Sequence, residues 1–200
     1  RDRYEGATGW LIGQPNDGLR AMFTMMNNAR LGVGGQGIGV AEAAFQHATD
    51  YALNRKQGKA TVPDANGTII DHADVRRMLI SMRADIFASR SLELENAKAI
   101  DMANATGEIE WVNRAAFLTP ITKVFGTEIG VNISYLGVQI HGGMGFIEET
   151  GAAQFSRDVR VTAIYEGTNG IQAMDLVGRK MMDNGETAYA IIKEIKVPVK

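Results

Sequence analysis

The sequence predicts an all-α protein, an up-and-down helical bundle with a short extended segment at its N-terminus. Apolar residues recur at three- and four-residue steps through several long runs, which is the period of an α-helix. Glycine, proline and asparagine breakers fall between these runs rather than at the short intervals typical of strands. Long helices joined by short connections bury their apolar faces most simply against one another, so we expect antiparallel packing.

The first helix follows a short non-helical segment. Residues 1–16 suit an extended chain, because Trp10-Leu-Ile12 is strand-like and Gly13-Gln-Pro-Asn-Asp-Gly18 contains turn residues. From Leu19 to Tyr51 the apolar period is helical. Glycine costs about 1 kcal/mol relative to alanine inside a helix, so the glycines in this run predict close packing against another helix or a bulky ligand. They are Gly32, Gly34, Gly35, Gly37 and Gly39.

The remaining elements follow in order. Residues 59–67 form an exposed loop, and a second long helix begins after Asp71 or Asp74 and ends near Asn104. A third spans about 108–142 and is interrupted or kinked at Pro120. Shorter helices cover about 149–159 and 169–182, and Asp183-Asn-Gly185 ends the last. We expect an excised piece of a longer protein: 1–16 ends a preceding domain and linker, 17–182 is the bundle, and 183–200 is a linker or the start of a further segment.

Composition disfavours several function classes. A net charge of −2 argues against nucleic acid or a membrane surface as the main partner. The absence of cysteine excludes disulfides and thiolate chemistry, and three scattered histidines have no metal-ligand spacing. No apolar run approaches the ~18 residues of a membrane span, and no signal peptide is visible. We therefore expect no metal, no nucleic-acid partner and no membrane span.

The candidate catalytic residue is Glu166. It lies in Ile164-Tyr-Glu-Gly-Thr-Asn-Gly-Ile-Gln172, about twenty residues after Gln139-Ile-His-Gly-Gly-Met-Gly-Phe146. Thr168 and Asn169 are both good N-cap residues, so the carboxylate stands on a loop that leads into a helix. The free N–H groups of the helix start lie beside it. On this motif alone, a loop glutamate that caps or solvates the helix end is the more common interpretation of Glu166.

Two further stretches extend the pattern: Gly18-Leu-x-x-Met-Phe-x-x-Met-Asn-x-Ala-Arg30 and Tyr51-Ala-x-x-Arg55-x-Gln57-Gly58. Together the motifs resemble the C-terminal all-α domain of the acyl-CoA dehydrogenase family, and the resemblance implies that residues 1–16 are the end of the β domain that precedes it and a linker. They are most similar to its branch of long bacterial enzymes that resemble methylthiopropionyl-CoA dehydrogenase. The resemblance implies α,β-desaturation of an acyl-CoA on FAD, with Glu166 taking the α-proton. It also implies an electron-transfer flavoprotein as acceptor, a homodimer or homotetramer, a bacterial cytoplasmic location, and an inactive fragment.

The resemblance also assigns binding residues. It implies that FAD is bound by Arg55, Gln57, Gln139, Gly142, Gly143 and Thr168, and acyl-CoA by Arg30, Tyr165 and Gly167. Arg55 would contact the pyrophosphate of a neighbouring subunit's FAD, because a guanidinium suits paired phosphate oxygens. Four residues have a second interpretation. Arg30 could be a surface helix charge, and Gly142 a helix C-cap. His72 could be a core or capping residue, and His141 a structural residue or one that lines the cofactor edge.

The sequence departs from the family at a few positions. A subset places its base just before Arg30, where this chain has Ala29, so Glu166 is the candidate base. Lys56-Gln57-Gly58 replaces a common Thr-Phe-Gly, which removes an aromatic contact to the cofactor, and Gly170 replaces a frequent glutamine. Two alternatives stay open: a non-catalytic bundle that serves assembly, and a related flavin oxidase that passes electrons to oxygen.

Overall fold

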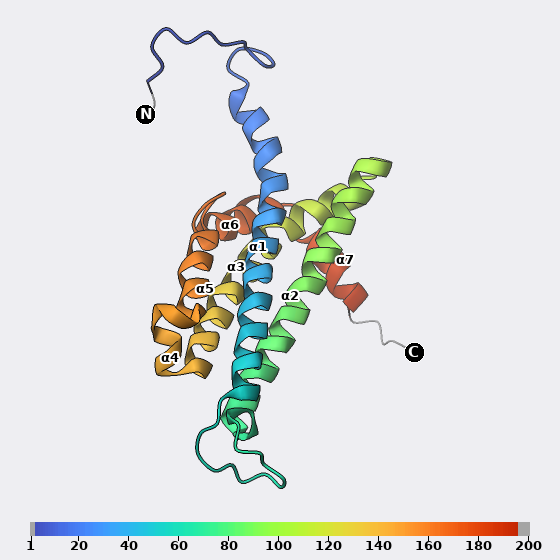
Figure 1. Ribbon diagram of the computed structural model, residues 1–200. Coiled ribbons are helices and arrows are strands. Elements are labelled where there is room, and N and C mark those ends of the chain that lie inside the picture. The colour runs from blue at the N-terminus through green and yellow to red at the C-terminus, as the bar shows by residue number, and fades with distance from the viewer. Residues whose placement is uncertain (1–2, 196–200) are drawn as a thin grey trace.

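The computed structural model describes residues 3–195, and within this range the chain is helical without a β-strand. Four helices run up and down beside one another (Figure 1). The predicted all-α bundle is confirmed. Its helices are α1 (Gly18–Asn54), α2 (Ala73–Thr106), α3 (Ile109–His141) and α5 (Ala152–Val159).

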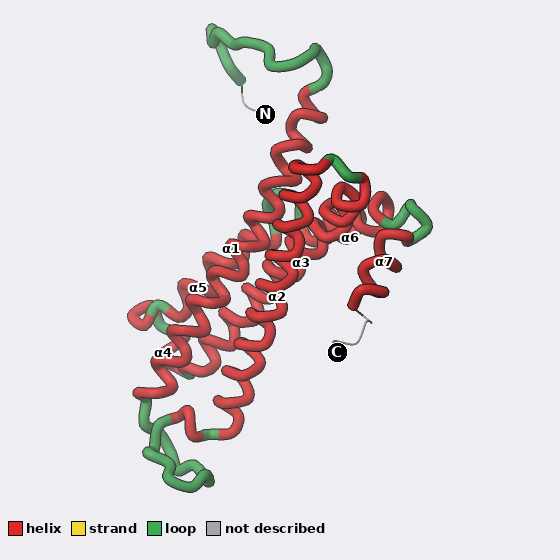
Figure 2. Tube along the Cα trace, turned by 90° about the vertical axis from the view of Figure 1, so that its right-hand side faces the viewer, coloured by secondary structure: helices red, strands yellow, loops and turns green. Residues whose placement is uncertain are grey.

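Short elements connect the long helices at the two ends of the bundle (Figure 2). At the lower end lie η1 (Ile69–Asp71), α4 (Gly143–Phe146) and η2 (Glu148–Thr150). At the other end lie η3 (Arg160–Ala163), α6 (Asn169–Asp175), a π-helical turn η4 (Leu176–Lys180) and α7 (Glu186–Ile195).

Three expectations differ from the structure. Trp10-Leu-Ile12 is not helical, but it forms no strand because nothing among residues 3–195 pairs with its backbone. Pro120 does not interrupt α3, since its burial between helices offsets the single hydrogen bond that proline removes. The helix expected over 169–182 is divided into α6 and the π-helical η4, and α7 occupies part of the range expected as a linker. Residues 196–200 lie outside the described range, and the domain boundaries stay predictions.

The closest contact in the bundle joins the backbones of α1 and α3. A methyl group added to Gly37 would lie 2.4 Å from the carbonyl oxygen of Gly126, and one added to Gly126 would lie 2.6 Å from that of Gly34. Gly130 meets Gly37 in the same way, at 2.8 Å. Of the five glycines predicted to pack closely, Gly34 and Gly37 therefore fix the spacing of α1 and α3, whereas Gly32 and Gly39 face open space.

The apolar core lies between α1, α2 and α3 in the half of the bundle away from α6. It consists of Ala41, Ala44, Ala48, Ala52, Ile69, Met78, Leu79, Met82, Ile86, Ile129, Ile133 and Ile140. Beside α6, by contrast, the buried side chains include charged and polar groups: Arg30, Lys123, Gln172 and Asp175. Buried polar groups require partners, so this half of the bundle is where a functional site is expected.

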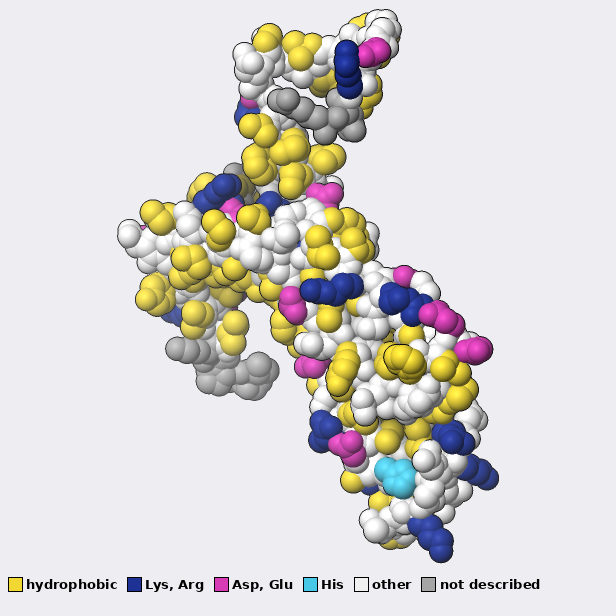
Figure 3. Space-filling view, turned by 90° about the vertical axis from the view of Figure 1, so that its left-hand side faces the viewer, with side chains coloured by type: hydrophobic (Ala, Val, Ile, Leu, Met, Phe, Trp, Pro, Cys, Tyr) yellow, Lys and Arg dark blue, Asp and Glu magenta, His cyan; other side chains and the backbone are white. Residues whose placement is uncertain are grey.

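The first turns of α1 extend beyond the bundle and expose apolar side chains. Leu19 is 68% exposed and Met25 is 60% exposed, and the space-filling view shows hydrophobic side chains gathered on this part of the molecule (Figure 3). Contiguous exposed apolar surface of this kind marks an interaction site. Among residues 3–195, no helix combines the length and apolarity that crossing a membrane requires.

The glycine contact leads to a stability prediction. Gly37→Ala should destabilise the protein by at least about 1–3 kcal/mol, because the added methyl group overlaps the backbone of Gly126. Gly39→Ala is the matched control: its methyl group enters open space, and it should stabilise α1 by up to ~1 kcal/mol through helix propensity. Urea unfolding measures both. Equal midpoints for the two variants would contradict the close contact.

Candidate active site and cofactor pocket

Glu166 stands on a strained turn between η3 and α6. Its φ of 53° is left-handed, which costs a residue with a side chain roughly 1–2 kcal/mol. Such strain tends to persist at functional sites, where the surrounding structure holds it. The turn ends at Thr168, whose hydroxyl oxygen accepts a hydrogen bond from the backbone N–H of Ile171 at 3.4 Å. The predicted N-cap is confirmed.

Buried side chains hold the backbone of this turn from below. The Glu166 carbonyl accepts hydrogen bonds from Nε of Arg30 at 3.4 Å and from Nε2 of Gln172 at 3.3 Å. Gln172, which is 0% exposed, also donates to the Gly167 carbonyl at 3.2 Å. A side chain at position 167 would approach Nε2 of Gln172 to 2.6 Å, so this close approach requires glycine.

The side chain of Glu166 is left free. It is half-buried, and among residues 3–195 neither its carboxylate nor its backbone N–H makes a hydrogen bond within the protein. The turn therefore combines a fixed backbone with an available carboxylate and an available donor. That combination is what a general base beside an oxyanion site requires.

Arg30 lies beneath the turn rather than on the surface. It is 5% exposed, and its Nη1 lies 3.5 Å from Oδ2 of Asp175 and 3.1 Å from Oδ1 of Asn27. The interpretation of Arg30 as a surface charge is wrong. Its contact with the Glu166 carbonyl makes it a support of the turn, and its substrate contact stays a prediction. Arg30 also lines a polar cavity of about 580 Å³ between α1, α2 and α3.

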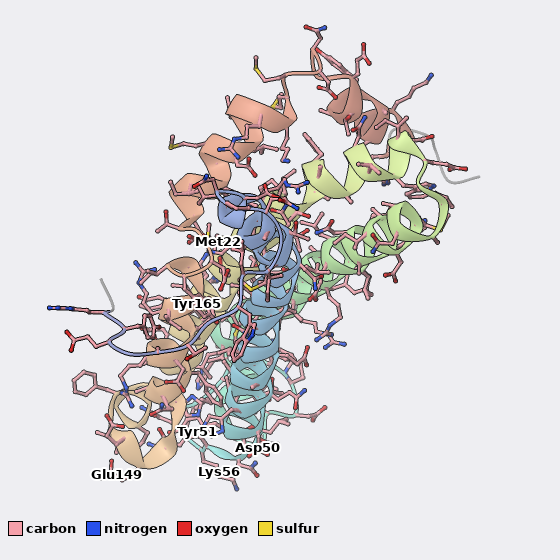
Figure 4. The ribbon with its side chains drawn as sticks, turned by 90° about the horizontal axis from the view of Figure 1, so that it is seen from above. Met22, Asp50, Tyr51, Lys56, Glu149 and Tyr165 are labelled. Carbon is pink, nitrogen blue, oxygen red and sulfur yellow. The ribbon has the colours of Figure 1, made fainter. Side chains whose placement is uncertain are left out.

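Tyr165 anchors the turn to the outer face of α1. Its hydroxyl donates to Oε1 of Gln36, and the side chain lies beside α1 in the view from above (Figure 4). The ring is 37% exposed, so it can form part of the wall of a substrate pocket, as the resemblance implied. α1 therefore contacts the turn twice, through Arg30 and through Gln36.

Lys123 is the buried cation of α3. It is 0% exposed, and its Nζ donates to Oδ1 of Asn169, the first residue of α6, at 2.8 Å. The Asn169 amide donates in turn to Oγ1 of Thr127 at 3.1 Å and to Oε1 of Glu128 at 2.7 Å. Burial, and then the charge of Arg30, lowers the pKa of Lys123 to about 8, and the nearby Glu128 opposes this.

Sequence reasoning missed Lys123, Gln172 and Asp175 as site residues. A signal was present in α3, where Lys123 stands among Thr119, Thr122 and Gly126, on the small-residue face that meets α1. A charged residue on a face that packs this closely is buried by its neighbours. Gln172 and Asp175 fall on one face of a helix that follows the motif directly.

A second cluster of the predicted residues lies at the opposite end of α1. Arg55, Gln57 and Gly142 line a cavity of about 350 Å³, together with Tyr51, His72 and His141. Arg55 is exposed and its Nη2 donates to Oε1 of Gln57 at 3.5 Å. Gly142 ends α3 with a φ of 61°, so the C-cap interpretation is confirmed and its cofactor role stays a prediction. Gln139, three residues before Gly142, and Gly143, directly after it, do not line the cavity.

Two histidines shape this second cavity. His72 is not a core residue: its Nε2 donates to the Gln57 carbonyl at 2.8 Å. His141 is buried, and its ring stacks against the rings of Tyr51 and His47, with centroids 4.2 Å and 4.7 Å away. Its Nδ1 donates to the Gly137 carbonyl, and its Nε2 has no partner in the described part of the chain. Burial lowers the pKa of His141, which favours the neutral ring.

The two clusters are far apart along one straight helix. Arg30 lies in α1 and Arg55 directly follows its last residue, so 25 residues separate them, which corresponds to roughly 37 Å at the rise of an α-helix. In Figure 4, Tyr51 and Lys56 lie together, away from Tyr165. The Glu166 turn and the Arg55 cavity are therefore separate sites within one chain.

The comparisons with known proteins agree with one another. The model described as "Acyl-CoA dehydrogenase, C-terminal domain" matches residues 16–182. The 3-methylmercaptopropionyl-CoA dehydrogenase of Ruegeria pomeroyi is 51% identical over 191 residues, which cover 92% of this chain and 32% of that protein. The caffeyl-CoA reductase-Etf complex subunit CarC of Acetobacterium woodii is 34% identical over 167 residues, covering 84% of this chain and 40% of that one.

A solved structure shows the same arrangement of helices. Butyryl-CoA dehydrogenase from Megasphaera elsdenii superposes with a TM-score of 0.70 at 28% sequence identity, over 83% of this chain and 39% of that one. The chain spans well under half the length of each of these relatives.

The pKa of Lys123 leads to a prediction about stability. The folded value of about 8 lies below the ordinary 10.5, so folding disfavours the protonated form. The resulting penalty is fully present below about pH 8 and is lost as pH rises toward 10.5. Relative to Lys123→Met, the wild type should therefore gain stability over this interval in urea unfolding. The exposed Lys98→Met should show a constant difference. A constant difference for Lys123→Met as well would contradict the burial of its charge.

Proposed function

The chain belongs to the acyl-CoA dehydrogenase family, and we propose that it supplies the catalytic base of an FAD-dependent acyl-CoA dehydrogenase. The reaction is the desaturation of an acyl-CoA thioester between its α and β carbons, and Glu166 takes the α-proton. The observation that carries this proposal is the Glu166 turn, in which a fixed backbone presents a free carboxylate. The match over residues 16–182 gives the turn its chemical context.

The free N–H of Glu166 supplies the second requirement of this chemistry. A proton next to a thioester is too weakly acidic for a carboxylate to remove quickly unless the developing enolate oxygen is stabilised. A donor fixed before the reaction provides that stabilisation without reorganisation. The Glu166 N–H has no partner among the described residues, and the carbonyl bonds of Arg30 and Gln172 fix the same backbone. It can therefore donate to the thioester oxygen beside the base.

The Arg55 cavity fits the pyrophosphate and adenosine end of a dinucleotide. Arg55 offers an exposed guanidinium for paired phosphate oxygens, and Gly142 has no side chain to obstruct a ligand. Buried Nε2 of His141, without a partner in the described chain, marks a polar side of the cavity. When bound, FAD supplies the acceptor for the β-hydride. Within residues 3–195 the Thr168 hydroxyl accepts one long hydrogen bond, so it is available to the flavin at the other site.

The distance between the two sites supports a homo-oligomer. The ribityl chain that joins the flavin ring to the pyrophosphate is much shorter than roughly 37 Å, so one FAD cannot reach both Glu166 and Arg55 of the same chain. Arg55 would then serve the FAD of a neighbouring subunit. An apolar groove of about 640 Å³ between α1 and α2, lined by Phe45, Leu79, Ile80 and Phe87, offers surface for such an assembly.

Further partners follow from the relatives and from the surface. One relative is named as a subunit of an Etf complex, which supports an electron-transfer flavoprotein as the acceptor. The exposed apolar turns of α1 would be covered by other domains of the full-length enzyme. A flavin oxidase of the same fold would instead consume oxygen, so oxygen uptake during flavin reduction separates the two activities.

The first test of the proposal removes the base. Glu166→Gln in the full-length enzyme should retain FAD and acyl-CoA, because the amide is nearly isosteric. Flavin reduction by acyl-CoA should slow by at least ~10²–10⁴-fold, since the amide cannot accept the proton. Anaerobic stopped-flow absorbance measures this rate, and the exposed Glu149→Gln is the control. A Glu166→Gln rate within about tenfold of wild type would remove Glu166 from this role.

The second test concerns the cofactor pocket. Arg55→Ala should weaken FAD retention, since a charge-assisted hydrogen bond contributes about 1.5–3 kcal/mol. Acyl-CoA affinity should change little, and excess FAD should restore both activity and the oligomer on gel filtration. The neighbouring Lys56→Ala, also exposed, is the matched control. Unchanged FAD affinity together with a collapse of acyl-CoA affinity would place Arg55 in the substrate site instead.

A further inference from the structure

Lys123 is a buried charge that the proposed mechanism does not use. It is fully buried within α3, and a Lys123 ammonium has three N–H donors, of which one contacts Asn169 in the described chain. Its charged neighbours are Arg30 on α1 and Glu128 on α3, and Asp175 on α6 pairs with Arg30. No carboxylate within salt-bridge distance pairs with Lys123 among residues 3–195.

A buried lysine without an ion pair does not stabilise the folded protein. Removing an ammonium group from water is unfavourable, and one hydrogen bond to a neutral amide offsets only part of that loss of hydration. An apolar residue of similar shape would pack at the same place without this penalty. Lys123 therefore reduces stability at a position where α3 meets the start of α6. Its contact with Asn169 must then be explained by the segment that it holds in place.

Asn169, which Lys123 contacts, connects this lysine to the Glu166 turn. Asn169 is the first residue of α6 and follows Thr168, the N-cap, and Gly167, whose carbonyl accepts from Gln172. The Asn169 side-chain nitrogen donates to Thr127 and Glu128, and its Oδ1 accepts from Lys123 at 2.8 Å and lies 3.3 Å from Oγ1 of Thr127. All its side-chain partners come from one stretch of α3, so the start of α6 is fixed to that helix.

We infer that Lys123 is a positioning residue for the proposed reaction: through Asn169 it holds the start of α6, and so the Glu166 turn, in the geometry needed for proton transfer. This inference rests on the proposed function of Glu166. Lys123 then holds the turn from α3, and Arg30 holds it from α1. The two sides together prevent the turn from sliding along or away from the bundle.

The test uses Lys123→Met and Asn169→Ala in the full-length enzyme. The limiting rate of flavin reduction should fall by up to ~10²-fold in each variant, because a displacement of about 1 Å costs that much. The acyl-CoA dissociation constant should stay within about threefold of wild type, as expected for loss of alignment and not of binding. The double variant should be no slower than the slower single variant, because both remove one interaction.

A second readout does not depend on activity. Hydrogen exchange, followed by mass spectrometry of the peptide over residues 164–175, should be at least ~tenfold faster in both variants. Thermal stability of Lys123→Met should be equal to or above that of wild type, because it removes a buried charge. Lys98→Met, which removes an exposed lysine from α2, should alter none of these quantities.

The outcomes separate this inference from the proposed function. Suppose that acyl-CoA reduces the flavin of the wild type but not that of Glu166→Gln. If Lys123→Met then shows wild-type rates of flavin reduction and of hydrogen exchange, the positioning role is wrong and the base assignment stands. If Lys123→Met is merely less stable, with an unchanged limiting rate, Lys123 is structural and the inference fails. If no acyl-CoA reduces the wild-type flavin, the proposed function fails, and the exchange rates alone then decide whether Lys123 holds the turn.

Discussion

The backbone contact between α1 and α3 is the constraint on which the site depends. Gly34 and Gly37 meet Gly126 and Gly130 at distances that leave no room for side chains. Because the two helices are so close, side chains from both reach the same short turn. Arg30 and Gln36 of α1 contact it from one side. Lys123 and Thr127 of α3 reach the first residue of α6 from the other. A wider spacing would leave the turn supported by only one helix.

The supports act on the backbone of the turn and leave its reactive groups free. Carbonyl oxygens of Glu166 and Gly167 point into the bundle and are hydrogen-bonded there. The carboxylate and N–H of Glu166 have no partner in the described chain. A catalytic group needs this division, since its own rotamer and position must be set by neighbours that do not take part in the reaction. The cost is a layer of buried charge, Arg30 with Asp175 and Lys123 with Asn169, in place of an apolar core.

Sequence reasoning succeeded where the physical signal is local. The periods of α1, α2 and α3 predict helices because each must bury one face, and Thr168 predicts the cap of α6 because it can accept from the next turn. Lys123 could not be placed in this way, since a lysine in a helix is usually exposed and only its neighbours in space bury it. The same limit applies to Trp10-Leu-Ile12, because a strand depends on a partner that local pattern does not identify. The contact of Arg30 with the Glu166 carbonyl depends on the approach of α1 to the turn before α6, which local pattern does not give, and its substrate contact stays a prediction.

The proposed reaction requires this turn to present Glu166 to the α-carbon of an acyl thioester. A structure of the full-length enzyme with FAD and a non-reactive acyl-CoA analogue would show whether it does. We expect a Glu166 carboxylate oxygen about 3–3.5 Å from the α-carbon, with the Glu166 N–H directed at the thioester oxygen. An analogue bound with its α-carbon facing another carboxylate, or a Glu166 side chain turned away while the backbone bonds to Arg30 and Gln172 stay intact, would contradict it.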